Sequence, residues 1–305
     1  MDSHDEKSGV LKSSGEGVDV DTDVDNLKPD FVKKIESFDV HNLRPEDIEY
    51  MHQVIGEFFV NKYSVRPELA AEIPSHTRML SNEEFRAKVL EKDSEAEDDL
   101  DELTGFYNEK DDCTYINMDY YDSPVELFST MTHEGLHFVS LRNGAGFGGY
   151  FAAPESLQEK EEMAYYARKG LISVVEGTTQ MLAWDALEEM GFTDNMASGY
   201  LPEVMVMRAV YGALPENMEK QLYFNTPMED LRMAIEETFA PEHSKTIRAG
   251  GVSGVFCDCL ANIGIVVENM EIALNDDDGD EAMALQDDIV SAIEFFKNER
   301  NKNGF

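Results

Sequence analysis

Two histidines and a glutamate are grouped at His133, Glu134 and His137, in the run His-Glu-Gly-Leu-His. Residues four apart on a helix share one face, with Cβ atoms roughly 5–6 Å apart. Two imidazoles at this spacing can bind one zinc ion through nitrogens about 2.0–2.1 Å from the metal. Glu134 projects from the neighbouring position, where it can reach a water on the metal. The pattern predicts zinc-assisted attack of water on a carbonyl, usually that of a peptide bond.

The competing explanation is that both histidines are ordinary core or surface residues and that the motif arose by chance. The chain has 7 His among 305 residues. The random expectation of an H-E-x-x-H run is therefore on the order of 0.02 per chain of this composition. Coincidence is thus the weaker explanation, and the neighbouring sequence supports the motif.

The residues around the motif predict a helix. Ser123 can cap its N-terminus, Pro124 suits the first helical position, and Glu126 completes a capping box. Apolar residues follow at helical spacing and leave one face to the two histidines, and a stop signal stands at Asn143-Gly144. Upstream, residues 113–121 are rich in β-branched and aromatic side chains, which predicts a strand.

A catalytic zinc needs a third protein ligand and an open position for water. Glu176 is the predicted ligand, within residues 171–190, which predict an apolar helix ended by Gly191. A carboxylate among apolar side chains is costly to bury unless it is paired or bound to metal. Gln180 follows one turn later, where it can hydrogen-bond a ligand. The alternative is that Glu176 is one of many solvated helix glutamates in this acidic chain.

An HExxH run followed by a glutamate on a later helix resembles the gluzincin zinc metallopeptidases. Glu176-Gly-Thr-Thr-Gln180 is similar to the E-G-x-T-E pattern of several gluzincin-type families, although Gln180 replaces a residue that is commonly acidic. Tyr200 stands where those families often have a tyrosine. The resemblance covers about residues 115–210, with a longer spacing before Glu176 than in thermolysin-like enzymes. It implies a zincin-like core whose edge strand lines the cleft and pairs with an extended substrate.

The mechanism expected from these residues uses one catalytic Zn²⁺. Held by the two motif histidines and Glu176, the ion would lower the pKa of its water toward about 7. Glu134 would accept the proton as general base and deliver it to the leaving amine. Tyr200 is the first candidate for donating a hydrogen bond to the oxyanion, and His243 is the second. The remaining alternatives are Tyr165, Tyr166 and Tyr211.

The charge of the chain bounds its partners. Asp and Glu number 63 against 25 Lys and Arg, which gives a net charge of −38. Such a chain should repel nucleic acid and anionic membranes, so neither is expected as a partner, and a protein or peptide substrate is. A high-salt source, a preference for basic protein substrates and nucleic-acid mimicry are possible reasons for the acidity. Plain solubility is the favoured one.

Cysteine usage and the N-terminus bear on location. Cys113, Cys257 and Cys259 contain no C-x-x-C pair, which favours a reducing compartment without disulfides. The N-terminus has neither the basic start nor the apolar stretch of a Sec signal. No apolar run reaches the roughly 18 residues of a membrane span. We expect a cytoplasmic protein, or one delivered by a non-Sec route or in a virion.

The predicted fold class is α+β, mostly α, with a zincin-like core, a small sheet beside the HExxH helix, and flanking helices. The predicted regions are a disordered acidic tail over 1–27, an N-terminal helical region over 28–104, the zincin-like core over 105–213, and a C-terminal helical region over 214–305 that packs on the core. Individual helices are predicted near 30–38, 45–62, 81–92, 156–169, 226–239, 252–274 and 280–299.

Two functions from different classes fit this sequence. The first is a zinc-dependent peptidase. The second is a non-catalytic zincin-fold protein with a structural or binding role, either virion-associated or an acidic inhibitor or mimic. Bound zinc alone would fit both, whereas proteolysis that depends on Glu134 would establish the first.

Overall fold

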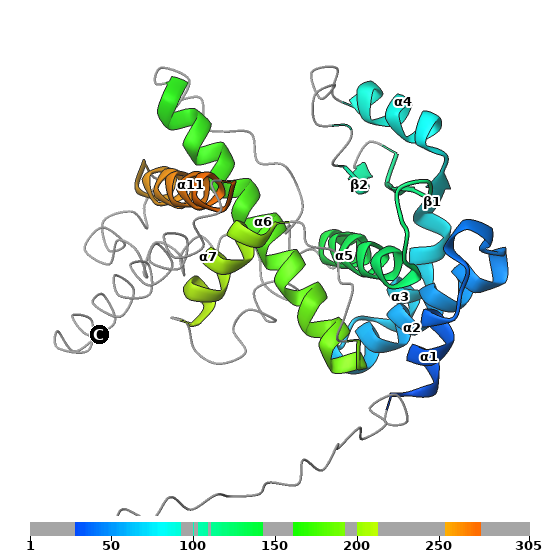
Figure 1. Cartoon of the computed structure of the whole chain (residues 1–305). Helices are drawn as coiled ribbons and strands as arrows, with labels where there is room; N and C mark the ends of the chain where they lie inside the picture. The colour runs from blue at the N-terminus through cyan, green and yellow to red at the C-terminus, as the bar shows by residue number, and fades with distance from the viewer. Residues whose placement is uncertain are drawn as a thin grey trace, which may run out of the picture.

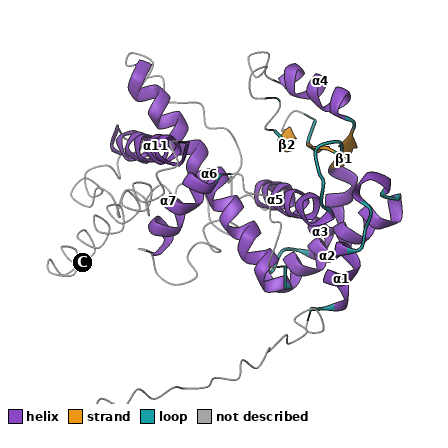
Figure 2. Ribbon diagram, viewed as in Figure 1, coloured by secondary structure: helices purple, strands orange, loops and turns teal. Residues whose placement is uncertain are grey.

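The computed structural model of this chain describes residues 28–92, 100, 103–108, 111–142, 161–192, 200–212 and 254–275. Over these residues the protein is mostly helical with a three-stranded sheet, as Figure 2 shows, so the predicted α+β, mostly α class is confirmed. The tail predicted over 1–27 and the helices predicted near 226–239 and 280–299 lie outside the described residues. None of the described helices combines the length and apolar character needed to cross a membrane.

The N-terminal part of the chain is built from helices of 3 to 19 residues. They are α1 (Asp30–Glu36), η2 (Val40–Asn42), α2 (Pro45–Tyr63), α3 (Pro67–Glu72), η3 (Ile73–His76) and α4 (Asn82–Lys92). The predictions near 30–38, 45–62 and 81–92 are confirmed within two residues at each end. At the start of α4 a capping box forms, because the Glu84 N–H donates to Oγ of Ser81 and the Ser81 N–H donates to Oε2 of Glu84.

The sheet contains β1 (Thr77–Leu80), β2 (Gly105–Asn108) and β3 (Cys113–Asn117) in the order β1-β3-β2. β3 runs parallel to β1 and antiparallel to β2. The strand predicted over 113–121 therefore exists in its first five residues. It is the central strand and not the edge strand that the resemblance implied, because all five of its side chains are buried and both its sides are paired. β2 is the edge strand beside the motif helix.

The motif helix α5 (Pro124–Arg142) lies between the N-terminal helices and α6 (Glu161–Met190), as Figure 1 shows. The predicted cap forms, because the Val125 N–H donates to Oγ of Ser123 at 3.2 Å. Every residue of α5 from Leu127 to Ser140 is buried. Gly135 makes this burial feasible, since a Cβ there would lie 3.3 Å from Cε2 of Phe59 on α2.

The helix that carries Glu176 is longer than predicted. Helices were expected over 156–169 and 171–190, but α6 is one continuous helix of 30 residues. Gly170, which separated the two predictions, lies inside α6 where α11 (Gly254–Asn275) crosses it. A Cβ at Gly264 of α11 would lie 2.9 Å from the backbone N of Gly170, so this glycine pair permits close helix packing. α11 confirms the helix predicted over 252–274.

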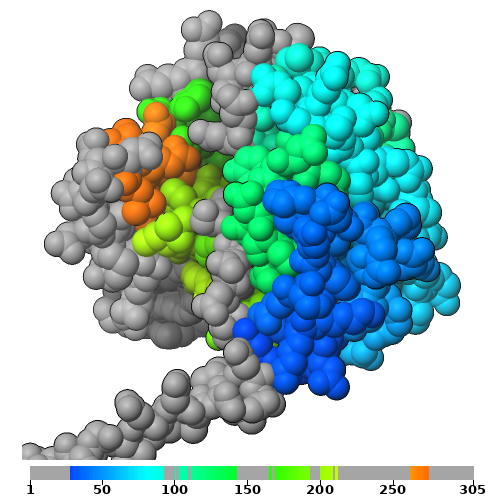
Figure 3. Space-filling view, turned by 45° about the vertical axis from the view of Figure 1, so that its right-hand side comes forward, coloured from blue at the N-terminus to red at the C-terminus, as the bar shows by residue number. Residues whose placement is uncertain are grey.

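α6 ends at Gly191, as predicted, with φ at +98°. The Phe192 N–H donates to the Leu187 carbonyl and the Gly191 N–H to the Glu188 carbonyl, which is a Schellman cap. Next comes α7 (Leu201–Gly212), a helix that sequence reasoning did not predict. In Figure 3, α7 and α11 lie on one side of α5, and α1 and α2 lie on the other. α6 contacts α5, α7 and α11, so its position depends on all three.

Candidate metal centre

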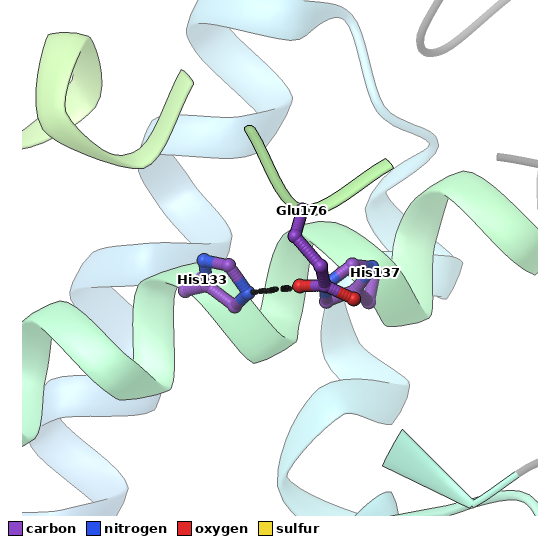
Figure 4. Close-up of side chains that lie close together, drawn as sticks. All are labelled: His133, His137 and Glu176. Carbon is purple, nitrogen blue, oxygen red and sulfur yellow. Dashed lines mark hydrogen bonds and ion pairs between the residues drawn. The ribbon is translucent and has the colours of Figure 1, made fainter. Parts of the chain in front are cut away.

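The three predicted ligands come together at the contact between α5 and α6. Nε2 of His133 and Nε2 of His137 are 3.0 Å apart, on successive turns of α5. Oε2 of Glu176, from the middle of α6, lies 3.2 Å from the first nitrogen and 3.1 Å from the second. Figure 4 shows the carboxylate of Glu176 directed between the two imidazoles.

This triangle of donor atoms fits a metal ion better than a set of hydrogen bonds. A hydrogen bond is strongest when the N–H···acceptor angle exceeds about 150°. A single N–H cannot reach that angle toward both of the other two atoms, because seen from it they lie roughly 60° apart. A tetrahedral zinc with bonds of about 2.0–2.1 Å would hold its ligand atoms roughly 3.3 Å apart. The observed distances of 3.0–3.2 Å are close to that spacing. The group of His133, His137 and Glu176 can therefore hold a metal ion.

Burial and charge differ among the three side chains. His133 and His137 are buried, whereas the side chain of Glu176 retains 21% of its exposure, so the site reaches solvent on that side. Burial by itself would raise the pKa of Glu176. The positive charge of His137 and hydrogen bonds from both histidines outweigh burial and hold that pKa below its usual range. Glu176 is thus kept as an anion, the form that a cation requires of a carboxylate ligand.

Glu134 occupies a different environment from the ligands beside it. Its side chain is buried, and its Oε2 has no hydrogen-bond partner among the described residues. Burial raises the pKa of Glu134 to about 7. The charge of His133 opposes this increase, and the negative charge of Glu176 adds to it. A carboxyl group with a pKa near neutrality can both accept and return a proton, as a general base must.

Sequence reasoning missed Gly105, which brings the edge strand to Glu134. A Cβ at Gly105 of β2 would lie 3.2 Å from Oε1 of Glu134 and 3.0 Å from Cγ2 of Thr130. Glycine permits this approach without displacing either side chain, whereas a Cβ would require Thr130 and Glu134 to move by a few tenths of an ångström. A glycine inside a strand is a known sign of such an approach, but it does not reveal which element comes close.

Tyr200 is the predicted oxyanion donor that the structure brings to the ligands. It directly precedes α7, and its ring is stacked on the imidazole of His133, with centroids 5.7 Å apart and planes 10° apart. The hydroxyl of Tyr211, in contrast, is buried and accepts a hydrogen bond from Oγ1 of Thr178. Tyr165 is exposed and packs edge-on against Tyr166. His243, the second candidate, lies outside the described residues.

Gln180 was predicted to hydrogen-bond a ligand from one turn beyond Glu176. It is buried, and its Nε2 has no hydrogen-bond partner within the described part of the chain, so this nitrogen does not make the predicted bond. Nδ1 of His133 is also buried and lacks a partner among those residues. The orientation of this imidazole therefore does not come from a described hydrogen bond at its second nitrogen.

Comparison with protein-family models, with curated proteins and with solved structures finds no match for this chain. Its function is therefore inferred from the geometry of its own residues. Two imidazoles and a carboxylate that can hold a metal ion stand beside a buried carboxyl group whose pKa is near 7. This arrangement can bind a Lewis acid and move a proton at the same place, which is the chemistry of metal-assisted hydrolysis.

Proposed function

We propose that this chain is a zinc-dependent peptidase of the gluzincin type. The observation that carries the proposal is the convergence of His133, His137 and Glu176 beside the buried Glu134. Imidazole and carboxylate donors suit Zn²⁺. When bound, zinc would polarise the scissile carbonyl and lower the pKa of a water to about 7.

Glu134 moves the proton in the proposed reaction. Its carboxylate accepts a proton from the attacking water and then passes it to the nitrogen of the leaving amine. A pKa of about 7 supports both steps, because the ionised and the protonated forms of the carboxyl group are then both populated at neutral pH. The low exposure of Glu134 also limits the loss of that proton to bulk water.

The edge strand β2 supports a peptide as the substrate. The Asn117 N–H donates to the Thr104 carbonyl, so the alternation of antiparallel pairing turns the N–H and C=O of Gly105 away from β3. Among the described strands, β2 pairs with β3 alone. An extended peptide that added to this edge would form backbone hydrogen bonds with Gly105 next to Glu134.

The same arrangement supports a zincin-like core over residues 105–213. An antiparallel edge strand lies against the HExxH helix, and a second helix supplies the glutamate ligand. β2 thus takes the place of the edge strand that the resemblance implies for residues 113–121. Tyr200 is the proposed oxyanion donor, because its ring lies against His133 and it is partly exposed to solvent.

The test combines metal analysis with a protease assay on the full chain. The unsubstituted protein should contain one zinc per chain and cleave unfolded protein substrates, and Glu134→Gln should keep the zinc and lose the cleavage. His133→Ala should lose the zinc, whereas His41→Ala, in the exposed η2 turn, should keep it. Cleavage retained by Glu134→Gln would overturn the mechanism. Stoichiometric zinc without cleavage in the unsubstituted protein would support the non-catalytic binding protein instead.

A further inference from the structure

The imidazole of His133 has an aromatic ring beside its face and lacks the hydrogen bond that the second nitrogen of a metal-binding histidine ordinarily makes. The second nitrogen of such a histidine usually donates to a carboxylate, a carbonyl or water, which sets the orientation of the ring. Nδ1 of His133 is buried and has no partner among the described residues. The ring of Tyr200 lies nearly parallel to this imidazole instead, at an interplanar angle of 10°.

A parallel contact of this kind restricts the imidazole. With centroids 5.7 Å apart, Tyr200 covers one side of the imidazole and restricts rotation about the Cβ–Cγ bond of His133. On the other side, His137 meets His133 edge-on, at 70° and 4.8 Å between centroids. The direction of Nε2 of His133 is thus set by packing between two rings.

Tyr200 holds its place in an unfavourable backbone conformation. Its φ is +61°, in the left-handed region that residues with bulky side chains rarely adopt. The Tyr200 carbonyl accepts the first hydrogen bond of α7, from the Val204 N–H at 2.9 Å. Such a conformation persists only where the surrounding structure enforces it, and α7 is the described element to which Tyr200 is bonded.

α7 is held against α6 by a close approach at Gly177, the residue after Glu176. A Cβ at Gly177 would lie 2.7 Å from both the carbonyl carbon and the carbonyl oxygen of Glu203. These are backbone atoms, so no side-chain rotation could relieve the clash. Gly177 therefore lets the first turn of α7 sit directly on the helix that carries the third ligand.

From these contacts we infer that Tyr200 is a positioning residue for the metal ligand His133, and that Gly177 holds Tyr200 in place through α7. The inference rests on the metal site of the proposed function. It gives the second residue of the Glu176-Gly-Thr-Thr-Gln180 run a physical role, which is to leave room for the backbone of Glu203. The ring of Tyr200 performs the positioning.

Metal affinity tests the role of Tyr200 separately from catalysis. Zn²⁺ affinity would be measured by competition with a chromogenic chelator, and coordination by the visible spectrum of the Co²⁺ form. Tyr200→Phe keeps the ring, so it should match the unsubstituted protein in both measurements. Tyr200→Ala should weaken Zn²⁺ binding by about 10–100-fold, the usual effect of losing a support for a ligand, and should change the Co²⁺ spectrum. Tyr165→Ala, an exposed tyrosine on α6, is the matched control and should change neither.

Gly177→Ala tests the link through α7. It should weaken Zn²⁺ binding as Tyr200→Ala does. The double variant should have the same Zn²⁺ affinity as the single variant that binds less tightly, because both substitutions act on one contact. Gly56→Ala, whose Cβ would meet only ordinary contacts at 3.6 Å or more, controls for adding a methyl group to a buried helix. Thermal melting would establish that each variant is folded.

The outcomes separate this inference from the proposed function. Unchanged affinity in Tyr200→Ala would overturn the positioning role, and so would equal losses in Tyr200→Phe and Tyr200→Ala. Additive losses in the double variant would overturn the link through Gly177. Absence of stoichiometric metal in the unsubstituted protein would instead overturn the metal site itself.

Discussion

Oε2 of Glu176 lies 3.2 Å from Nε2 of His133, across the contact between α5 and α6. Together with Nε2 of His137 these two atoms surround a common point, and a metal ion there would require an ionised carboxylate and a lone pair on each imidazole nitrogen. Neither helix carries all three ligands, so metal binding requires α5 and α6 to be packed together. A metal ion at this place would in turn stabilise that packing.

Glu176→Ala should weaken zinc binding by more than roughly 10²-fold, because the loss of a mere supporting contact already costs about 10–100-fold. Competition with a chromogenic chelator would measure the dissociation constant. Glu188→Ala removes an exposed glutamate from the same helix and should leave the constant unchanged. Equal affinities in Glu176→Ala and the unsubstituted protein would move the third ligand elsewhere.

Glu134→Gln should change how the stability of the metal-free protein depends on pH. The pKa of Glu134 is raised from 4.5 to about 7, so ionising the folded state costs free energy. That cost is absent below pH 4.5, grows as the pH rises, and is complete above about pH 7. The difference in unfolding free energy between Glu134→Gln and the unsubstituted protein should therefore rise in favour of the variant by on the order of 2–3 kcal/mol from pH 5 to pH 8. Urea unfolding at both pH values would measure the gain.

The control for that experiment is Glu49→Gln, which removes an exposed carboxyl group from the second turn of α2. It should show no comparable gain between the two pH values. If Glu134→Gln behaved like this control, the buried carboxyl group would not titrate near neutrality, and its assignment as a general base would lose its main support.

Gly105→Ala should reduce kcat while leaving zinc bound. The new methyl group would meet Oε1 of Glu134 at 3.2 Å and Cγ2 of Thr130 at 3.0 Å, so it would displace the general base or the edge strand. These neighbours would have to move by a few tenths of an ångström. Since a displacement of about 1 Å in a catalytic group costs roughly 10²-fold in rate, the expected loss in kcat is smaller than that. Steady-state kinetics together with zinc analysis would separate this effect from loss of metal. Full kcat in the variant would show that Glu134 does not need this space.

Tyr200→Phe should lower kcat by about 10²–10³-fold if its hydroxyl donates to the oxyanion, since this is the usual effect of removing one such donor. Zinc affinity should be unchanged, because the ring remains stacked on His133. Tyr165→Phe, at an exposed position, should have normal kinetics. Full activity in Tyr200→Phe would move the donor to another group, with His243 next in order.

Gly191→Ala should destabilise the protein, whereas Gly56→Ala should stabilise it. Gly191 has φ at +98°, where an alanine is strained by about 1–2 kcal/mol. Its Cβ would also lie 3.1 Å from Cδ of Pro29. Gly56 lies within α2 with room for a methyl group, and alanine there should gain up to about 1 kcal/mol from helix propensity. Thermal or urea unfolding of the two variants should show opposite signs. Destabilisation by both would contradict the prediction for Gly56, and stabilisation by both would contradict that for Gly191.

The sequence alone determined the features that depend on neighbours in the chain. Ser123 caps the motif helix, Gly191 ends the next long one, and the two histidines share a face because a helix repeats every four residues or so. Glu176 was singled out because an anion in an apolar helix needs a cation. Gly170 misled the prediction, since a glycine inside a helix resembles a boundary unless the packing partner is known.

Only the tertiary structure decided which distant residues surround those ligands. Gly105 reaches Glu134, the backbone of Glu203 rests on Gly177, and Tyr200 stacks on a histidine far away in the chain. It also decided that β3 is central and β2 lies at the edge. The physical reason is that periodicity and capping act over a few residues and leave local signals. The packing of one helix or strand on another depends on shape across the whole core, which no local pattern specifies.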